Sequence, residues 1–234
     1  MNPRLKALNL MNSADGIARP IVGDFTQGLS APDFSMEGPT PGVKSVFCPA
    51  ATAECILYNA KMSDKGCFEF WFKPNGWNVT NGQMGGSRSA QSVLICYNAA
   101  NLYEGTHILY YLPVLGLWWD YADPAGGYYQ METTVPEADL VADVWQHFAL
   151  SWDRTKDPNR MIFKDGKKVA ETNNAVFSIF TDNPATEPIG NYNGGPGIGA
   201  EGWLFGFKHW DFMKTNFDDR FNFRAGIGDQ KLIV

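Results

Sequence analysis

The chain has 234 residues, of which 44% are hydrophobic and 14% aromatic, and its formal net charge at pH 7 is −6. This composition excludes a largely disordered chain, and the acidic balance argues against electrostatic binding to nucleic acid or to anionic lipid. Glycine (24) and proline (14) are spread along the sequence, as expected when many short strands are joined by turns. The length suits one all-β sandwich better than two domains.

Residues 1–42 are turn-rich and show little hydrophobic periodicity, so we interpret them as an extended arm that lies on the body of the protein or on a neighbouring subunit. The start of the chain, MNPRLKALNLMNSADG, is basic but has no apolar run of signal-peptide length. No segment approaches the roughly 18 continuous apolar residues of a membrane span. We therefore expect a chain made in the cytoplasm, neither exported by the usual route nor inserted in a membrane.

From residue 43 onwards, short runs of alternating apolar and polar residues predict strands. In one of the clearest, Phe68, Phe70 and Phe72 share one face of the strand, and Glu69 lies on the other. The strands predicted up to residue 135 cover 45–47, 53–58, 67–73, 92–97, 107–112, 115–121 and 128–135.

The second half of the chain contains the strongest local signal. In the run 145–153, Phe148, Leu150 and Trp152 alternate with smaller or polar residues, which is typical of a strand with one buried face. Asp165-Gly166 then predicts a tight hairpin, because both central residues of such a turn need positive φ. Further strands are predicted over 160–164, 168–172 and 202–211, and a short helix over 218–221.

No segment of 12 residues has a helical period. About twelve short strands therefore predict an all-β fold, a two-sheet antiparallel sandwich of the jelly-roll kind. The sandwich is expected to cover residues 43–215, with the arm 1–42 before it and a tail 216–234 packed on the sandwich or on a neighbour.

The order of five segments resembles the laminin G-like branch of the concanavalin A-like lectin and glucanase superfamily. These segments are CFEFWFKP, WQHFALSWD, MIFKDGKKVAE, IGNYNGG and GWLFGFKHWD. Trp145, His147 and Asp165-Gly166 match the motifs of that branch residue for residue, and the resemblance covers roughly residues 43–215. It implies a lectin-like sandwich in which His147 belongs to the scaffold. Where the family usually carries an acidic pair in its last strand this chain has Phe205-Gly206, so a family metal site does not carry over automatically.

Catalytic signatures are missing. Relatives of this fold that cleave polysaccharides need two carboxylates about 5 Å apart, usually on alternate residues of one strand, and no E-x-D-x-x-E pattern occurs. The acidic clusters Glu137-Ala138-Asp139 and Asp218-Asp219 suit solvated charge or helix caps better. For a lyase, His107 with Tyr110 is the local candidate. We predict that the protein is not an enzyme.

Cysteine and acidic residues give two further hypotheses. The four cysteines match no zinc pattern, so we expect free buried thiols, with Cys48–Cys55 as the alternative disulfide. Calcium is the candidate cofactor, held by Asp120 and Asp123 with help from Asn98 or Asn101, or by Asp153 and Asp157 at the other end. The alternative is that these residues are turn formers.

Aromatic residues cluster between positions 118 and 129. Sugars bind by stacking their apolar faces on exposed rings while polar groups take the hydroxyls. Trp118 and Trp119 must face opposite sides of a strand, so one is expected in the core and one outside. The candidate carbohydrate-binding residues are Trp77, Trp118, Trp119, Tyr121, Tyr128, Tyr192 and Asn193.

Two functions compete. The first interpretation is a non-catalytic structural component on the surface of a larger particle, such as a phage virion capsid-decoration or tail protein, which contacts other subunits through residues 1–42. The missing signal peptide and the missing enzymatic residues favour it. The alternative is a stand-alone carbohydrate-binding module, which the usual chemistry of the fold favours. A polysaccharide hydrolase or lyase is the third candidate.

Overall fold

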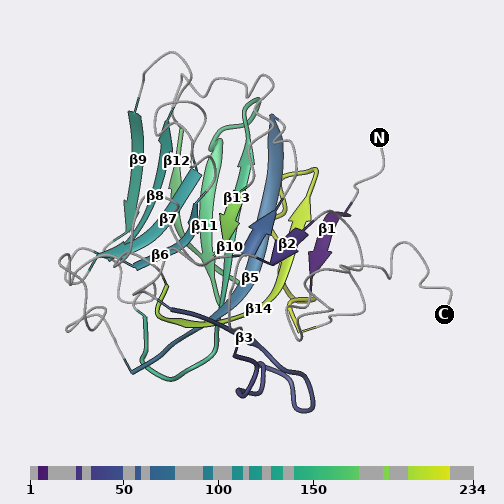
Figure 1. The fold of residues 1–234 in the computed structure, drawn as a ribbon. Coiled ribbons are helices and arrows are strands. Elements are labelled where there is room, and N and C mark those ends of the chain that lie inside the picture. The colour runs from purple at the N-terminus through teal and green to yellow at the C-terminus, as the bar shows by residue number, and fades with distance from the viewer. Residues whose placement is uncertain are drawn as a thin grey trace, which may run out of the picture.

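The computed structural model describes residues 5–9, 25–27, 33–49, 56–58, 64–76, 92–96, 107–112, 116–122, 128–133, 140–173, 187–189 and 200–221. In these residues all regular structure is β-strand, arranged as two antiparallel sheets (Figure 1). The prediction of an all-β, antiparallel sandwich is therefore confirmed. Within the same residues, no helix is long and apolar enough to cross a membrane.

Each sheet contains seven of the described strands. Sheet A contains, in spatial order, β1 (Leu5–Asn9), β14 (Gly202–Trp210), β5 (Lys65–Pro74), β10 (Gln146–Asp153), β11 (Arg160–Lys164) and β12 (Lys167–Thr172), with β3 (Val46–Cys48) also paired to β14. Sheet B contains, in spatial order, β2 (Phe25–Gln27), β4 (Ile56–Tyr58), β13 (Glu187–Ile189), β6 (Ser92–Cys96), β7 (His107–Leu112), β8 (Gly116–Ala122) and β9 (Tyr128–Thr133).

Eleven of these strands overlap a predicted one, and three do not. β1 and β2 both lie within residues 1–42. β1 pairs with β14 of sheet A and β2 pairs with β4 of sheet B, so the two strands belong to different sheets. β13 was also not predicted. The helix predicted over 218–221 is wrong, because these residues form turns.

The inner face of sheet A follows the predicted alternation. Phe70 lies opposite Phe148, and Phe68 lies opposite Leu150, so the apolar residues of β5 and β10 share one side. Trp152 lies opposite Gly66, where any side chain would overlap its ring, so Gly66 leaves room for this tryptophan. These side chains are buried and form the layer between the sheets.

Asp165 and Gly166 form the predicted two-residue hairpin between β11 and β12. Their φ angles are 52° and 84°, as a type I′ turn requires. Asp165 also fixes the neighbouring strand: the backbone N–H of His147 donates to Asp165 Oδ1 (2.9 Å), and the Asp165 N–H donates to the His147 carbonyl (2.8 Å). Two residues of the family-like motifs therefore meet in space.

A β-bulge in β14 changes the face on which its later residues lie. Phe205 pairs with Trp71 and Lys208 pairs with Glu69, so two residues of β14 oppose the single residue between those partners. Gly206 has a φ of 67°, which glycine adopts without strain. Because of the bulge, Phe205 and Lys208 both lie on the outer face of sheet A with Glu69. In a regular strand, two residues three positions apart would lie on opposite faces.

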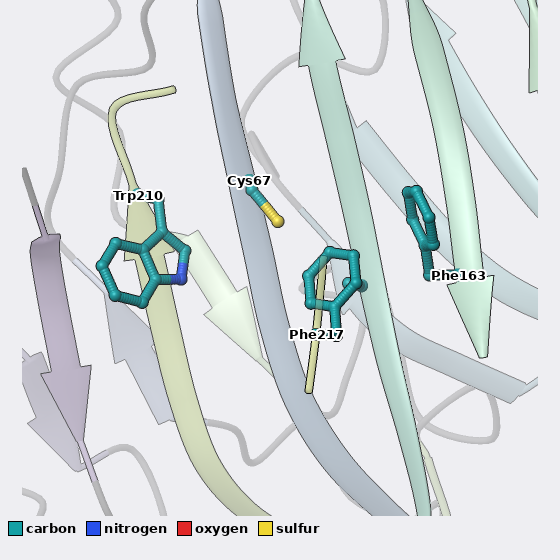
Figure 2. Close-up of a cluster of buried hydrophobic side chains, with 5 residues drawn as sticks. Cys67, Phe163, Trp210 and Phe217 are labelled. Carbon is teal, nitrogen blue, oxygen red and sulfur yellow. The ribbon is translucent and has the colours of Figure 1, made fainter. Parts of the chain in front are cut away.

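The segment that follows β14 covers the outer face of sheet A. Phe217 lies between Cys67 of β5 and Phe163 of β11, over the strands (Figure 2). Its ring centroid is 4.7 Å from that of Phe163, and Trp210 belongs to the same buried cluster. This face, which the sequence pattern marks as the polar one, is therefore buried too.

Candidate functional site

The outer face of β7, β8 and β9 includes the positions of two of the aromatic residues predicted to bind sugar, Trp118 and Tyr128. Trp119 is fully buried, and its ring lies 6.3 Å from that of Trp152 in sheet A. The face of β8 that contains Trp119 therefore points into the sandwich, and Trp118, which is half-buried, lies on the opposite face. The two tryptophans differ in burial as the alternation predicts.

The strand register extends this outer face on both sides of Trp118. Trp118 lies between Tyr110 of β7 and Glu132 of β9. The next row of the same face places Asp120 beside Gln130 of β9. Aromatic, carboxylate and amide residues thus follow one another across neighbouring strands, a combination that suits a polyhydroxylated ligand.

Some predicted residues share this face and others do not. Tyr128 lies opposite Ala122 and so belongs with Asp120 and Trp118, whereas Tyr121 occupies the core-facing register with Trp119. The burial of Trp119 places it in the core and away from any ligand. Trp77, Asp123, Tyr192 and Asn193 lie outside the described residues, as do Asn98, Asn101, Glu137 and Asp139.

The sequence did not single out Tyr110 or Glu132 as cross-strand partners of Trp118, or Gln130 as the partner of Asp120. Their relation depends on the pairing of β7 and β9 with β8, which no local pattern encodes. The register also separates the candidate lyase pair, since His107 and Tyr110 are three residues apart on a regular strand and face opposite sides.

Asp153, one member of the second candidate calcium pair, is engaged in a turn. Asp153 Oδ1 accepts hydrogen bonds from the Thr155 backbone N–H (2.9 Å) and from Thr155 Oγ1 (2.7 Å), the pattern of an Asx turn. No group of three or more His, Cys, Asp or Glu residues suited to a metal ion occurs in the described part of the chain.

A buried ionic cluster lies on the outer face of sheet A, centred on Glu69. The Glu69 carboxylate accepts hydrogen bonds from Trp210 Nε1 and from Lys214 Nζ (2.7 Å). His147 Nε2 lies 3.4 Å and Lys208 Nζ 3.8 Å from its other oxygen. The side chains of Glu69 and His147 are each only 1% exposed, so a small-molecule substrate has no access to them. This cluster fits a structural role.

The pKa values of the cluster follow from burial and charge. Burial alone raises the pKa of Glu69, but the hydrogen bond from His147 and the charges of Lys208 and Lys214 together lower it to about 2. Burial lowers the pKa of His147 below its usual 6.5, so this ring is neutral at pH 7. Burial raises the pKa of the Cys67 thiol, and the charge of Glu69 adds to the effect. Cys67 is thus a free, buried and protonated thiol, unsuited to nucleophilic chemistry.

These shifts predict acid sensitivity. Glu69 stabilises the fold above its ordinary pKa of 4.5, and that contribution disappears as the pH falls towards 2. Its loss amounts to about 3 kcal/mol. His147 acts in the same direction, because the unfolded chain gains a proton below pH 6.5 that the folded chain binds less readily. Urea unfolding between pH 7 and pH 2 should show falling stability, and Glu69→Gln should flatten the part below 4.5. An unchanged slope in this variant would contradict the assignment.

A surface cavity of about 340 Å³ lies beside the apolar cluster around Phe217, at the end of sheet A where β10 turns into β11. Part of its wall is apolar and comes from Met161, Phe212 and Met213. Met161 and Phe212 are half-buried and pack against the cluster around Phe217, so the wall continues a rigid core. The volume lies at the lower end of the range of small-molecule sites.

No protein-family model matches the chain, and no curated protein matches it either. Solved structures do match. The binding domain of Paraclostridial Mosquitocidal Protein 1 superposes with a TM-score of 0.67 at 14% identity, covering 95% of this chain and 52% of that one. Domain 4 of AbnA, a GH43 extracellular arabinanase from Geobacillus stearothermophilus solved with arabinotriose, gives 0.61 at 13% identity, with 91% and 95% covered.

The ligand-binding domain of botulinum neurotoxin serotype D, solved in complex with N-acetylneuraminic acid, gives a TM-score of 0.64 at 11% identity, covering 94% of this chain and 50% of that one. The chain thus spans about half the length of the two toxin domains and nearly all of the arabinanase domain. At these identities the likeness establishes the fold alone. Of these three structures, two are described as binding domains and the third as one domain of an arabinanase.

Proposed function

We propose that the protein is a non-catalytic carbohydrate-binding module whose ligand lies on the outer face of β7, β8 and β9. The observation that carries the proposal is the row formed by Tyr110, Trp118 and Glu132, in which a half-buried tryptophan stands between an aromatic and an acidic residue. Its indole would stack on the apolar face of a sugar ring, and the carboxylate and the neighbouring amide of Gln130 would bind hydroxyls.

Two of the matched structures support the choice of ligand class. The arabinanase domain holds arabinotriose, and the neurotoxin domain holds N-acetylneuraminic acid. We further infer that the module is laminin G-like, since His147 and Asp165, which match the motifs of that branch, bond to each other. Tyr128 belongs to the proposed site, and Asp120 with Asp123 remains our candidate for a calcium ion beside it.

The comparisons favour this module over a virion component, because the matched domains belong to toxins and to an arabinanase. β1 and β2 also pair with strands of this same chain, so these parts of residues 1–42 are engaged within it. A docking arm for other subunits is therefore the second candidate. Deletion of residues 1–30 would distinguish the two functions. If these residues dock the chain to other subunits, the deletion should dissociate a native assembly while glycan binding persists.

Binding to immobilised glycans tests the site. Trp118→Ala should weaken binding about tenfold or more, because it removes the stacking surface, whereas Trp118→Phe should retain part of it. Trp145→Ala is the matched control, a half-buried tryptophan on another surface whose Nε1 donates to the Glu37 carbonyl (3.1 Å). Affinities should be measured on an array that includes arabinotriose and N-acetylneuraminic acid. A blank array for the wild-type chain, or equal binding by Trp118→Ala, would refute the proposal.

A further inference from the structure

We propose that the cavity beside the β10–β11 turn is a second saccharide-binding site, which takes a neutral sugar unit. It lies on sheet A and is built from residues separate from those around Trp118. The inference rests on the proposed function only for the class of ligand.

The wall of the cavity offers a flat apolar surface held from behind. The ring centroid of Phe212 lies 5.7 Å from that of Trp210 in an edge-to-face arrangement, and Trp210 is itself buried and bonded to Glu69. Phe212 is therefore positioned by the core while remaining half exposed to the cavity. Met161 and Met213 flank it, and their flexible side chains adapt to the outline of a ligand.

The rim of the cavity carries groups of both signs. Lys65 and Lys156 contribute positive charge and Asp157 contributes negative charge, while the buried Asp153 adds negative charge from within its turn. An anion or a cation would therefore meet a like charge on either side. A neutral polyol avoids this repulsion, because each of its hydroxyls can accept a hydrogen bond from a lysine ammonium or donate one to a carboxylate. The hydroxyl of Thr215, which is exposed, adds a further partner.

Rim and wall together select the ligand class. The apolar wall would take the C–H face of one sugar ring, and the rim would take its hydroxyls. A charged sugar such as N-acetylneuraminic acid fits the balanced rim less well than a neutral one. We therefore expect the cavity to prefer neutral sugars, whereas a basic pocket would prefer anionic ones.

Methionine methyl NMR reports on this cavity directly. With ¹³C-methyl methionine, millimolar arabinotriose, maltotriose or cellotriose should shift the resonances of Met161 and Met213. Met36, which lies elsewhere near Lys73, should stay unshifted and serves as the internal control. N-Acetylneuraminic acid should produce no comparable shift. Absence of shifts with all three neutral trisaccharides, or equal shifts with the charged sugar, would overturn the inference.

Two variants locate the effect. Phe212→Ala should weaken the neutral ligand about tenfold. Because this variant also loses packing, Thr215→Trp provides a second test: position 215 is exposed, so the fold should tolerate an indole that fills the cavity and abolishes the shifts. Shifts that persist in Thr215→Trp would place the ligand elsewhere and refute the assignment.

The two proposals can fail separately. If Trp118→Ala leaves the Met161 and Met213 shifts intact while array binding weakens, the two sites stand as independent. If array binding is unchanged by Trp118→Ala but the shifts occur, the proposed site on β7–β9 fails and the cavity stands. If Trp118→Ala removes the shifts, the cavity is not an independent site and the inference is wrong.

Discussion

Replacement of Glu69 by alanine is expected to lower the free energy of unfolding by about 3–5 kcal/mol. The carboxylate is the common partner of Lys208 and Lys214, which are buried with it, and of the Trp210 indole N–H. Its removal leaves the buried ammonium groups of Lys208 and Lys214 without this negative partner. Lys214 keeps one carboxylate contact, with Asp219 (2.8 Å). Urea unfolding at pH 7 measures the effect.

A surface ion pair supplies the control. Glu171 pairs with Lys168 on β12, where both side chains are almost half exposed. Glu171→Ala should therefore cost about 0–1 kcal/mol. The Glu69→Ala and Lys214→Ala changes should also combine to less than the sum of their separate effects, because each removes the partner of the other. Additive effects, or a loss in Glu69→Ala no larger than in Glu171→Ala, would show that the cluster contributes little to stability.

Trp119→Ala is expected to destabilise the protein by about 3–5 kcal/mol through the cavity it leaves between the sheets. The Trp119 side chain is 0% exposed, and its ring contacts Trp152 across the sandwich. The Arg160 guanidinium carbon lies 5.3 Å from its centroid, so the variant also removes a cation–π contact with a buried charge. Thermal and urea unfolding should both record the loss.

Trp118→Ala is the natural comparison, since it removes the same side chain from the next residue. Because Trp118 is half-buried on the opposite face, we expect about 1 kcal/mol or less from its truncation, together with the loss of glycan binding. Equal destabilisation by the two variants would mean that the outer face of β8 is as tightly packed as the core, and would weaken the proposed site.

Local patterns predicted much of the fold. The alternation of Phe68, Phe70 and Phe72 defined β5, and Asp165-Gly166 defined a hairpin, because turn geometry and side-chain alternation act between neighbours in the sequence. β1, β2 and β13 were missed because runs of three to five residues take their strand conformation from the strand beside them.

The sequence failed most clearly on the outer face of sheet A. Alternation marks Glu69 as solvent-facing, whereas it is buried under a segment that brings Lys214 to it from 145 positions away. The bulge at Gly206 adds Lys208 to the same cluster, although a regular strand would have placed it on the face opposite Phe205. Neither the covering segment nor the bulge can be recognised from the alternation of residues along a strand.

Local alternation and turn chemistry were enough to predict an antiparallel sandwich, because eleven of the described strands carry such a signal even though β1, β2 and β13 do not. The packing of the two sheets places Trp119 inward and Trp118 outward, strand pairing sets which residues lie beside Trp118, and the covering segment after β14 places the cavity at Phe212. Those facts depend on strand register and on long-range covering of a sheet face, and such contacts are set by the packing of distant segments rather than by neighbouring residues.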